Sequence, residues 1–156
     1  MSRTELRNKV REIDKRFWIN EMEQLKTLEI YRKYKKEIKE VRIYDNRISS
    51  KWLFRARSNS LKVNQRSYFL KKGHKEEDKI CGLCNKEEES LEHFILKCKD
   101  LGGKRNKELI KKYKGRNGKE TVGLLLFKTK GEDLESIKEM LNNMWVTREK
   151  LLELKG

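Results

Sequence analysis

The first part of the chain carries apolar residues at every third or fourth position. Over residues 3–25 this spacing is that of one face of an α-helix. The stripe consists of Leu6, Val10, Ile13, Phe17 and Leu25, and it is widened by Trp18 and Met22. We interpret it as ordinary core packing, because an amphipathic helix usually buries its apolar face.

A second helix is expected after this stripe, with Thr27 as its N-cap. Its apolar positions share one face: Leu28, Tyr31, Ile38 and Val41. The polar stretch 44–46 then breaks the pattern, and Ser49 or Ser50 can cap a third helix. Trp52, Leu53 and Ala56 are expected to face inward in that helix.

Aromatic residues are interleaved with basic ones between residues 52 and 69. This arrangement suits a nucleic-acid surface, because cations neutralise phosphates and exposed rings stack on unpaired bases. The same rings would serve equally well in a hydrophobic core. We favour the core interpretation for the aromatic residues, which are Trp52, Phe54, Tyr68 and Phe69.

The middle of the chain holds the pattern C-x2-C-x8-H-x4-C, formed by Cys81, Cys84, His93 and Cys98. It contains all three cysteines of the chain and one of its two histidines. Three thiolates and one imidazole are typical of a closed, tetrahedral, structural zinc site. A disulfide is disfavoured, because the number of cysteines is odd and C-x-x-C closes a very small loop. We therefore predict one Zn²⁺ with these four ligands.

Short helices are expected on the C-terminal side of this motif. Ser90 caps a helix over 91–98, whose apolar residues pack the zinc knuckle against the domain: Leu91, Phe94 and Ile95. Gly102-Gly103 is expected to end that helix. A basic helix over 104–114 should follow, with Leu109, Ile110 and Tyr113 inward.

The remaining segments are a turn, an apolar run and a long helix. The turn covers residues 115–118, and the apolar run 121–127 is buried as either helix or strand, which periodicity alone does not decide. Gly131 is expected to break the chain before a last helix over about 132–154. Its stripe is Leu134, Ile137, Leu141, Met144, Arg148 and Leu151.

The composition predicts a thin core. The chain has 156 residues, of which 42% are charged and 35% hydrophobic, and it contains no proline. A bound metal would help to compensate, because zinc binding contributes folding free energy. We predict a mostly α fold, a small helical domain organised around the CCHC knuckle. Its segments are 1–45, 46–119 and 120–156, which together form one compact domain.

The positive charge is concentrated on both sides of the knuckle. The net charge is +15, and nine basic residues lie between Asp45 and Glu76 without any acidic residue. Ten more lie in 97–119 against two acidic ones. Such a surplus indicates a polyanionic partner, RNA or DNA. The predicted phosphate contacts are Arg47, Lys51, Arg55, Arg57, Lys62, Arg66, Lys71, Lys72, Lys104, Arg105, Lys111 and Lys112.

Membrane insertion is not expected. The sequence has no signal peptide and no apolar run near 18 residues. Reduced, metal-ligating cysteines are typical of an intracellular, nuclear or cytoplasmic protein.

Four segments in this order resemble the C-terminal region of reverse transcriptases from LINE-type, non-long-terminal-repeat retrotransposons. They are 27–31, 43–46, 53–64 and 81–98, and the most specific is Leu-Glu-His-Phe-Ile-Leu before the last cysteine of the CCHC motif. The resemblance covers roughly residues 27–105. It implies a zinc-binding segment that follows the polymerase and helps to hold template RNA or target DNA. It also implies the same four zinc ligands.

The chain departs from that family in lacking its polymerase. There is no Tyr-x-Asp-Asp motif, and a chain of this length cannot hold fingers and palm. Some relatives carry an endonuclease after the CCHC site, but Glu-x-Lys matches in so charged a tail are expected by chance. The chain therefore resembles a detached tail.

Three functions compete at this level. The leading hypothesis is a zinc-stabilised nucleic-acid-binding module without catalysis. The second is a subunit of a larger nucleoprotein complex that docks through its terminal helices, using Trp18, Met22, Met140, Met144 and Trp145. The third, a zinc-assisted nuclease, is disfavoured because four protein ligands leave the metal no open position and only His74 remains as a free histidine.

Overall fold

The computed structural model describes residues 1–37, 42–70 and 72–156, which fall into two compact units. Unit 1 is Met1–Arg42 and unit 2 is Ile43–Gly156. The predicted segments 46–119 and 120–156 both lie in unit 2. Within the described ranges all regular elements are helical and no strand occurs, which confirms the mostly α fold around the CCHC cluster.

Unit 1 is dominated by one long helix, α1 (Arg3–Gln24). The Ser2 hydroxyl accepts a hydrogen bond from the Glu5 amide at 3.2 Å, and the Glu5 carboxylate accepts one from the Ser2 amide at 2.6 Å. This reciprocal capping box satisfies two backbone donors that a helix start otherwise leaves without partners. The predicted helix over 3–25 is confirmed.

The apolar stripe of α1 is not a core, and that part of the prediction is wrong. Four of its side chains are about half exposed or more, with exposed fractions of 55% for Leu6, 48% for Val10, 58% for Ile13 and 67% for Phe17. Among the described residues of unit 1, the chain folds back onto the last turns of α1. There Arg32 donates to the carbonyls of Met22 (3.4 Å) and Glu23 (2.8 Å).

The second helix of unit 1 is shorter than predicted. A 3-10 turn, η1 (Lys26–Leu28), leads into α2 (Glu29–Tyr34). Thr27 lies inside η1 and does not cap α2, whose N-cap position is Leu28. The predicted inward residues Ile38 and Val41 lie outside the described residues.

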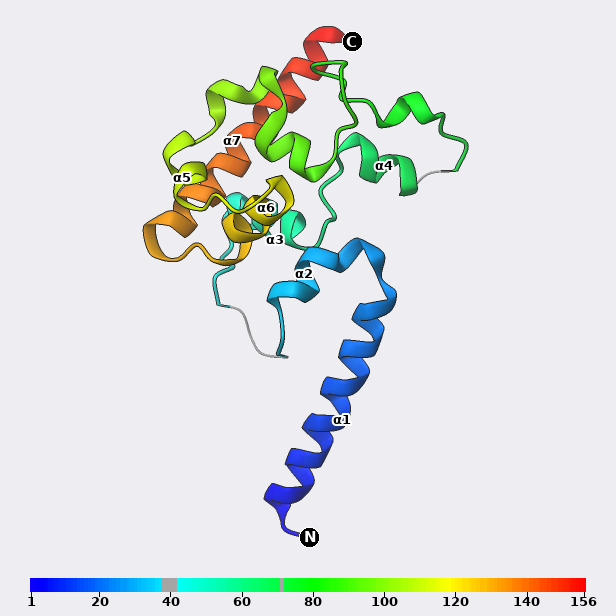
Figure 1. Ribbon diagram of the computed structural model, residues 1–156, viewed down its shortest axis with the longest axis vertical. Helices are drawn as coiled ribbons and strands as arrows, with labels where there is room; N and C mark the ends of the chain where they lie inside the picture. Colours follow the sequence, from blue (N-terminus) through cyan, green and yellow to red (C-terminus); the bar gives the residue numbers. More distant parts are fainter. Residues whose placement is uncertain (38–41, 71) are drawn as a thin grey trace. The chain divides into compact units, whose positions relative to one another are not determined.

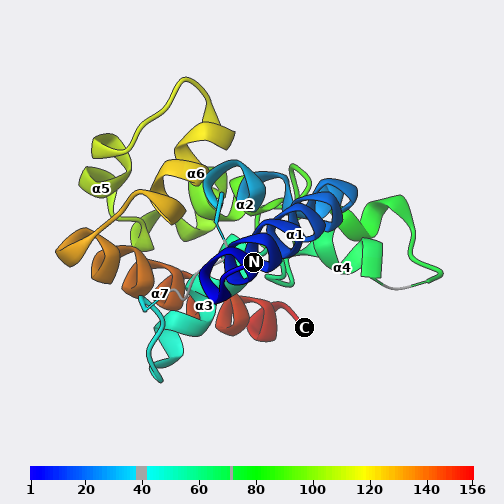
Figure 2. The ribbon, with the colours of Figure 1, turned by 90° about the horizontal axis from the view of Figure 1, so that it is seen from below.

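The longest helix of unit 2 is α7 (Gly131–Lys155), and α3 (Ile48–Arg57) packs beside it (Figures 1 and 2). The indole N–H of Trp52 donates to the Asn142 side chain at 3.0 Å. The ring of Trp145 lies 5.2 Å from that of Trp52 and 5.6 Å from that of Phe94. These aromatic contacts join both helices to the segment that carries the metal ligands.

Shorter elements complete unit 2 around α7 (Figure 1). The apolar run 121–127 is resolved as a helix, because Asn117 caps it by accepting from the Glu120 amide at 2.9 Å. Val122, Leu125 and Leu126 of this helix are buried. The elements are α4 (Asn64–Leu70), η2 (Glu76–Lys79), the π-helix η3 (His93–Lys97), η4 (Lys99–Lys104), α5 (Lys107–Lys112) and α6 (Gly118–Phe127).

Two helix boundaries differ from the prediction near glycine. Gly131 does not break the chain but begins α7, with a φ of +56° that a side chain would strain. Gly102 and Gly103 lie inside η4 and do not end the preceding helix, which already ends at Lys97. The helix ends there because Cys98 leaves the helical conformation, with a ψ of 117°.

The third helix also begins earlier than predicted, at Ile48 with Arg47 as N-cap. Ser50 is therefore inside the helix, where its hydroxyl donates to Asp45 at 2.7 Å. The predicted inward residues Trp52, Leu53 and Ala56 are buried, as expected. The core interpretation is wrong for Phe54 and Phe69, which are 53% and 65% exposed. Their rings contact Tyr44 and Tyr68, respectively, at the surface of unit 2.

Among the described residues, no helix combines the length and the apolar character needed to cross a bilayer.

Candidate metal centre

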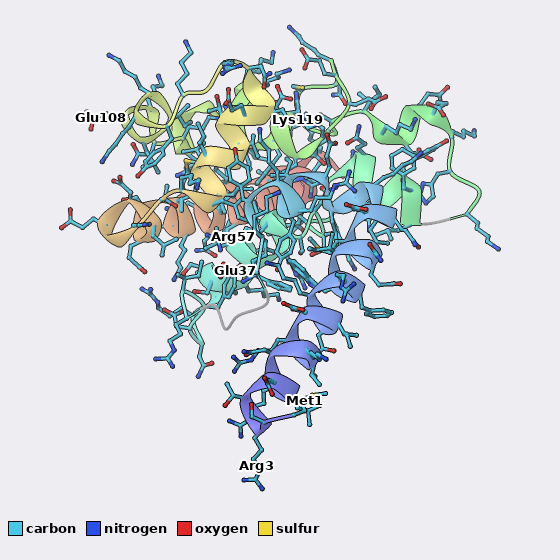
Figure 3. The ribbon with its side chains drawn as sticks, turned by 60° about the horizontal axis from the view of Figure 1, so that its bottom comes forward. Met1, Arg3, Glu37, Arg57, Glu108 and Lys119 are labelled. Atoms are coloured by element: carbon cyan, nitrogen blue, oxygen red, sulfur yellow. The ribbon has the colours of Figure 1, made fainter. Side chains whose placement is uncertain are left out.

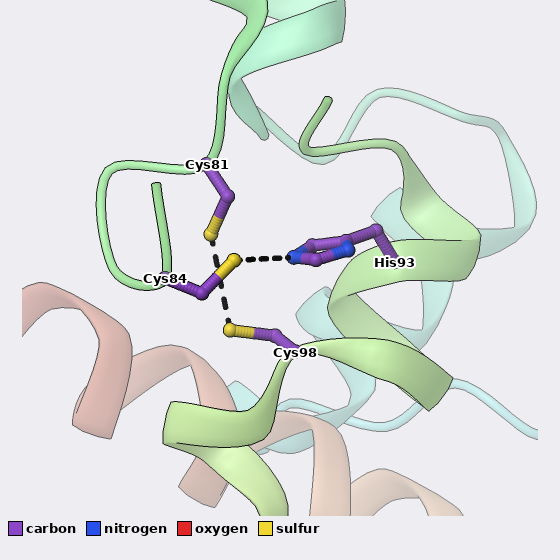
Figure 4. Close-up of side chains that lie close together, drawn as sticks. All are labelled: Cys81, Cys84, His93 and Cys98. Carbon is purple, nitrogen blue, oxygen red and sulfur yellow. Dashed lines mark hydrogen bonds between the residues drawn. The ribbon is translucent and has the colours of Figure 1, made fainter. Parts of the chain in front are cut away.

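The four predicted ligands come together in one cluster (Figure 4). Their ligand atoms all lie within 4.8 Å of one another. The sulfurs of Cys81 and Cys98 are 3.8 Å apart, and the sulfur of Cys84 lies 3.4 Å from Nε2 of His93. Cys81, Cys98 and His93 are buried, and Cys84 is partly exposed. Four soft or borderline donors facing one point could hold a metal ion.

The first two ligands sit on a tight loop. The Cys81 amide donates to the Glu87 carbonyl at 2.8 Å, and the Asn85 amide donates back to the Cys81 carbonyl at 2.9 Å. Asn85 adopts a φ of +54°, a left-handed conformation that asparagine tolerates better than most residues. An isolated antiparallel bridge between Ile80 and Glu88 closes the loop at its base. This reversal turns both thiols toward the same point.

The other two ligands depend on the π-helix η3. Residues five apart point about 140° away from each other on an α-helix, at about 100° per residue. In η3 the turn is wider, and the Cys98 amide donates to the His93 carbonyl, five residues back, at 2.8 Å. The wider turn brings His93 and Cys98 to the same side of the backbone. The Ser90 hydroxyl accepts from the His93 amide at 3.0 Å, so the predicted cap is in place.

Burial and hydrogen bonds from backbone amides shift the pKa values of the three thiols in opposite directions. Burial opposes ionisation of Cys84, but hydrogen bonds from the amides of Lys86 and Glu87 and from the other thiols outweigh it, so the pKa of Cys84 lies below its usual value. Burial raises the pKa of Cys81 to about 12 and also raises the pKa of Cys98. The backbone amides of Leu83 and Cys84 donate to the Cys81 sulfur, and those of Asp100 and Leu101 donate to the Cys98 sulfur. These bonds oppose the effect of burial on both pKa values but do not outweigh it.

A carboxylate orients the histidine ligand. Nδ1 of His93 lies 3.3 Å from the Glu87 carboxylate, while Nε2 faces the cysteine sulfurs. A hydrogen bond from Nδ1–H leaves the Nε2 lone pair free for a metal, which is the usual arrangement of metal-binding histidines. Glu87 belongs to the acidic run of the knuckle, and the sequence analysis assigned it no role.

A buried ion pair joins the knuckle to α7. Glu89 is 1% exposed and Arg148 is 4% exposed. The Arg148 guanidinium donates to both carboxylate oxygens, at 2.6 and 2.8 Å, and the Asn64 amide donates to the same carboxylate at 2.7 Å. The Glu89 carboxylate lies 3.9 Å from the Cys81 sulfur. The arginine therefore balances the charge of a buried carboxylate that lies beside a candidate metal-binding thiol.

Sequence reasoning missed this pair because Glu89 stands in a run of three glutamates. Arg148 offered a clue, since it occupies an apolar position in the stripe of the last helix. The end of α7 also contacts the knuckle, where the Lys155 ammonium donates to the carbonyls of Gly82, at 3.2 Å, and Leu83.

The twelve residues predicted to contact phosphates differ in their exposure and in their ion pairs. Arg55 and Arg66 are half-buried, and Lys71 lies outside the described residues. Arg47 is exposed but pairs with Asp45 (2.7 Å) and Glu135, and Lys112 pairs with Asp133 at 2.7 Å. Besides Lys112, five more are exposed lysines: Lys51, Lys62, Lys72, Lys104 and Lys111.

Two of the predicted arginines are bound to the protein's own backbone. Arg57 (Figure 3) is buried, and its Nε donates to the Leu126 carbonyl at 2.6 Å. Arg105 is half-buried and donates to three carbonyls, those of Phe94 (3.1 Å), Ile95 (2.7 Å) and Cys98 (2.6 Å). The last of these carbonyls belongs to a metal ligand. Both guanidinium groups are thus used in holding the fold.

The residues expected to dock a larger partner are also placed by the fold. Met140, Met144 and Trp145 are buried within unit 2, where they pack under α3 and the knuckle. Met22 is buried and Trp18 is half-buried.

No family model, curated protein or solved structure matches this chain.

Proposed function

We propose that this chain is a zinc-stabilised, non-catalytic module that binds RNA or DNA. The observation that carries the proposal is a Cys3His cluster in the middle of a chain with a net charge of +15. The metal supplies structure, and the exposed lysines on both sides of the cluster supply attraction for phosphates.

Zinc fits the distances in the cluster. With Zn–S bonds of about 2.3 Å and Zn–N bonds of about 2.0 Å, a tetrahedral site separates two sulfurs by about 3.8 Å and a sulfur from a nitrogen by about 3.5 Å. The observed separations are 3.8 Å and 3.4 Å. Three thiols and an imidazole suit zinc better than magnesium or calcium, which prefer oxygen ligands. Four protein ligands complete the coordination, so the metal is structural.

The CCHC resemblance to the C-terminal region of LINE-type reverse transcriptases supports the same function. We propose kinship with that zinc-binding segment, whose role in the family is to help hold template RNA or target DNA. The chain would then contribute binding without polymerisation, inside an intracellular compartment where thiols stay reduced.

The proposed contact surface consists of the exposed lysines of unit 2. Lys104 and Lys111 belong to the densest basic segment, 97–119, while Lys51, Lys62 and Lys72 belong to the earlier one. Arg57 and Arg105 are left out, because their guanidinium groups are engaged by backbone carbonyls. A lysine ammonium is a point charge and lacks the planar pair of donors with which arginine recognises a base edge. Exposed lysines are therefore better suited to contacting phosphates than to reading the base sequence.

The test is a titration of the zinc-loaded chain with labelled single-stranded RNA and duplex DNA over a salt series. Affinity should fall steeply with salt, and Lys104→Gln with Lys111→Gln should reduce the slope of log K against log salt by about two. Lys130→Gln with Lys150→Gln, exposed lysines outside both basic segments, is the matched control and should leave the slope almost unchanged. Affinity that is independent of salt would rule out the proposal.

A further inference from the structure

The exposed stripe of α1 has the spacing of a coiled-coil seam. Leu6, Val10, Ile13 and Phe17 follow one another at intervals of four, three and four residues. This spacing places Val10 and Phe17 at a positions and Leu6 and Ile13 at d positions of a heptad. The helix that carries them is 22 residues long, and Figure 3 shows its side chains projecting around it, with Met1 and Arg3 at its beginning.

The seam lies on a face that unit 1 does not use for its own packing. Met22, the buried residue of α1, follows Phe17 by five positions and so points about 140° away from it. The seam side chains are 48–67% exposed. A contiguous apolar stripe of this kind on a capped helix marks an interaction surface.

The charges beside the seam identify the partner. Lys9 and Arg16 occupy g positions, and Asp14 and Glu21 occupy e positions. Within unit 1 none of these four side chains has an ion-pair partner among the described residues. Lys9 and Arg16 on one edge, with Asp14 and Glu21 five residues further along on the other, make the surface complementary to itself. Arg7, at the first e position, faces the uncharged Ser2 of a parallel partner, and Glu23, at the last g position, lies beyond the seam.

We propose that α1 forms a parallel two-stranded coiled coil with α1 of a second copy of this chain. In a parallel pair each g residue faces the e residue of the following heptad of its partner. Lys9 then faces Asp14 of the second copy and Arg16 faces its Glu21. By symmetry both contacts occur twice, so all four charge pairs are attractive.

The antiparallel alternative is disfavoured by the same charges. With the two seams overlapped, g residues face g residues and e residues face e residues. Lys9 of one copy then meets Arg16 of the other, which gives two repulsive pairs, and Asp14 meets Arg7 of the other copy, which gives two attractive pairs in place of the four of the parallel arrangement. Like charges at such positions are destabilising.

The seam is short, so the association depends on concentration. Past Phe17 the next core positions are Asn20 and Gln24, which are polar. Four apolar layers per chain therefore hold the pair. Both chains leave a parallel coil at the same end, and two copies of unit 2 are thereby held together, which raises the avidity of any site in unit 2.

The experiment is sedimentation velocity of the zinc-loaded full chain over a range of protein concentrations, without nucleic acid. The wild-type chain should pass from monomer to dimer as concentration rises. Ile13→Lys should remain monomeric, because it places a charge in the seam. Asn8→Lys adds the same charge on the opposite face of α1 and should dimerise like the wild type.

A charge exchange tests the orientation. Lys9→Glu with Arg16→Glu should raise the dissociation constant about tenfold or more, because four attractive pairs become repulsive. Asp14→Lys with Glu21→Lys should do the same, and mixing the two variants should restore dimers. A wild-type chain that stays monomeric, or a dimer that survives Ile13→Lys, overturns the proposal. A dimer that survives Lys9→Glu with Arg16→Glu overturns the parallel arrangement.

Discussion

The two units of this chain carry similar apolar periodicity but differ in what covers it. Ile13 on α1 is 58% exposed, whereas Ile137 on α7 is fully buried. Both belong to helical stripes of apolar residues three or four positions apart. The stripe of α7 is covered by α3, by η4 and by the segment that carries the metal ligands. Periodicity thus predicts a helix and its apolar face, while burial depends on what the rest of the chain places against that face.

The Cys3His cluster lies where unit 2 closes over its stripe. The segment around the cluster contains only short helical turns and one isolated bridge, and a chain with 42% charged residues has little apolar material to hold it. The cluster fixes this segment, and Glu89 with Arg148 ties it to α7. Unit 1 contains no comparable cluster among its described residues, and its stripe stays exposed.

The largest effect is expected from removing a ligand. His93→Ala should abolish stoichiometric zinc and the cooperative unfolding of unit 2, because apparent structural-zinc free energies of about 10–16 kcal/mol are largely folding free energy. Metal analysis and thermal melting followed by circular dichroism measure both. His74→Ala removes the only other histidine, which lies outside the cluster, and should change stability by less than about 0.5 kcal/mol. Equal behaviour of the two variants would contradict the assignment.

The next largest effect concerns the buried ion pair. Arg148→Met leaves Glu89 buried without its counter-charge, which should lower the free energy of unfolding by about 3–5 kcal/mol. Denaturant unfolding of the zinc-loaded chain provides the measurement. Lys150→Met, on an exposed position of the same helix, is the control. Adding Glu89→Gln to Arg148→Met should recover part of the loss, and no recovery would mean that the arginine acts by packing alone.

A direct comparison of the two stripes uses matched truncations. Ile137→Ala should cost about 2–5 kcal/mol of unfolding free energy, because it opens a cavity in a packed core. Ile13→Ala, measured at low protein concentration where the chain is monomeric, should cost less than about 0.5 kcal/mol. Similar costs at both sites would show that α1 buries its stripe within the chain.

The smallest effect is expected at the histidine's partner. Glu87→Gln weakens the hydrogen bond to His93 Nδ1 and should lower zinc affinity about tenfold, the lower end for such partners. A competition titration with a chromophoric chelator measures the change. Glu88→Gln removes the same charge from the next residue, whose side chain accepts a hydrogen bond from the Gln65 side chain and makes none with His93, and should leave affinity unchanged. A tenfold loss of zinc affinity in both variants would mean that the loss of a nearby negative charge, and not of the hydrogen bond to His93, causes the effect.

The Cys3His cluster was accessible from the sequence because the spacing that brings it together is local. The spacing of Cys81, Cys84, His93 and Cys98 sufficed, since few alternatives employ every cysteine of a chain in one short motif. The π-helical turn was not accessible. It places two residues five apart on the same side of the backbone, an arrangement that no helix propensity encodes.

Basic residues were harder to assign, because charge alone does not show whether a side chain faces solvent or binds the protein's own backbone. Arg105 and Lys104 are adjacent in the sequence, yet Arg105 holds three carbonyls and Lys104 faces solvent. Only the path of the backbone around η3 distinguishes them. The exposed seam of α1 was misjudged for a similar reason, because Ile13 satisfies the pattern of a core residue whether the partner lies in the same chain or in another.

The most direct test of the zinc-centred account is a zinc titration of the metal-free chain, followed by near-ultraviolet circular dichroism of its tryptophans. Trp52 and Trp145 are buried in the packing that the cluster anchors. We expect the tryptophan signal to increase linearly with added zinc and to reach its maximum at one zinc per chain. A full signal before any zinc is added, or one that never responds to it, would contradict the account.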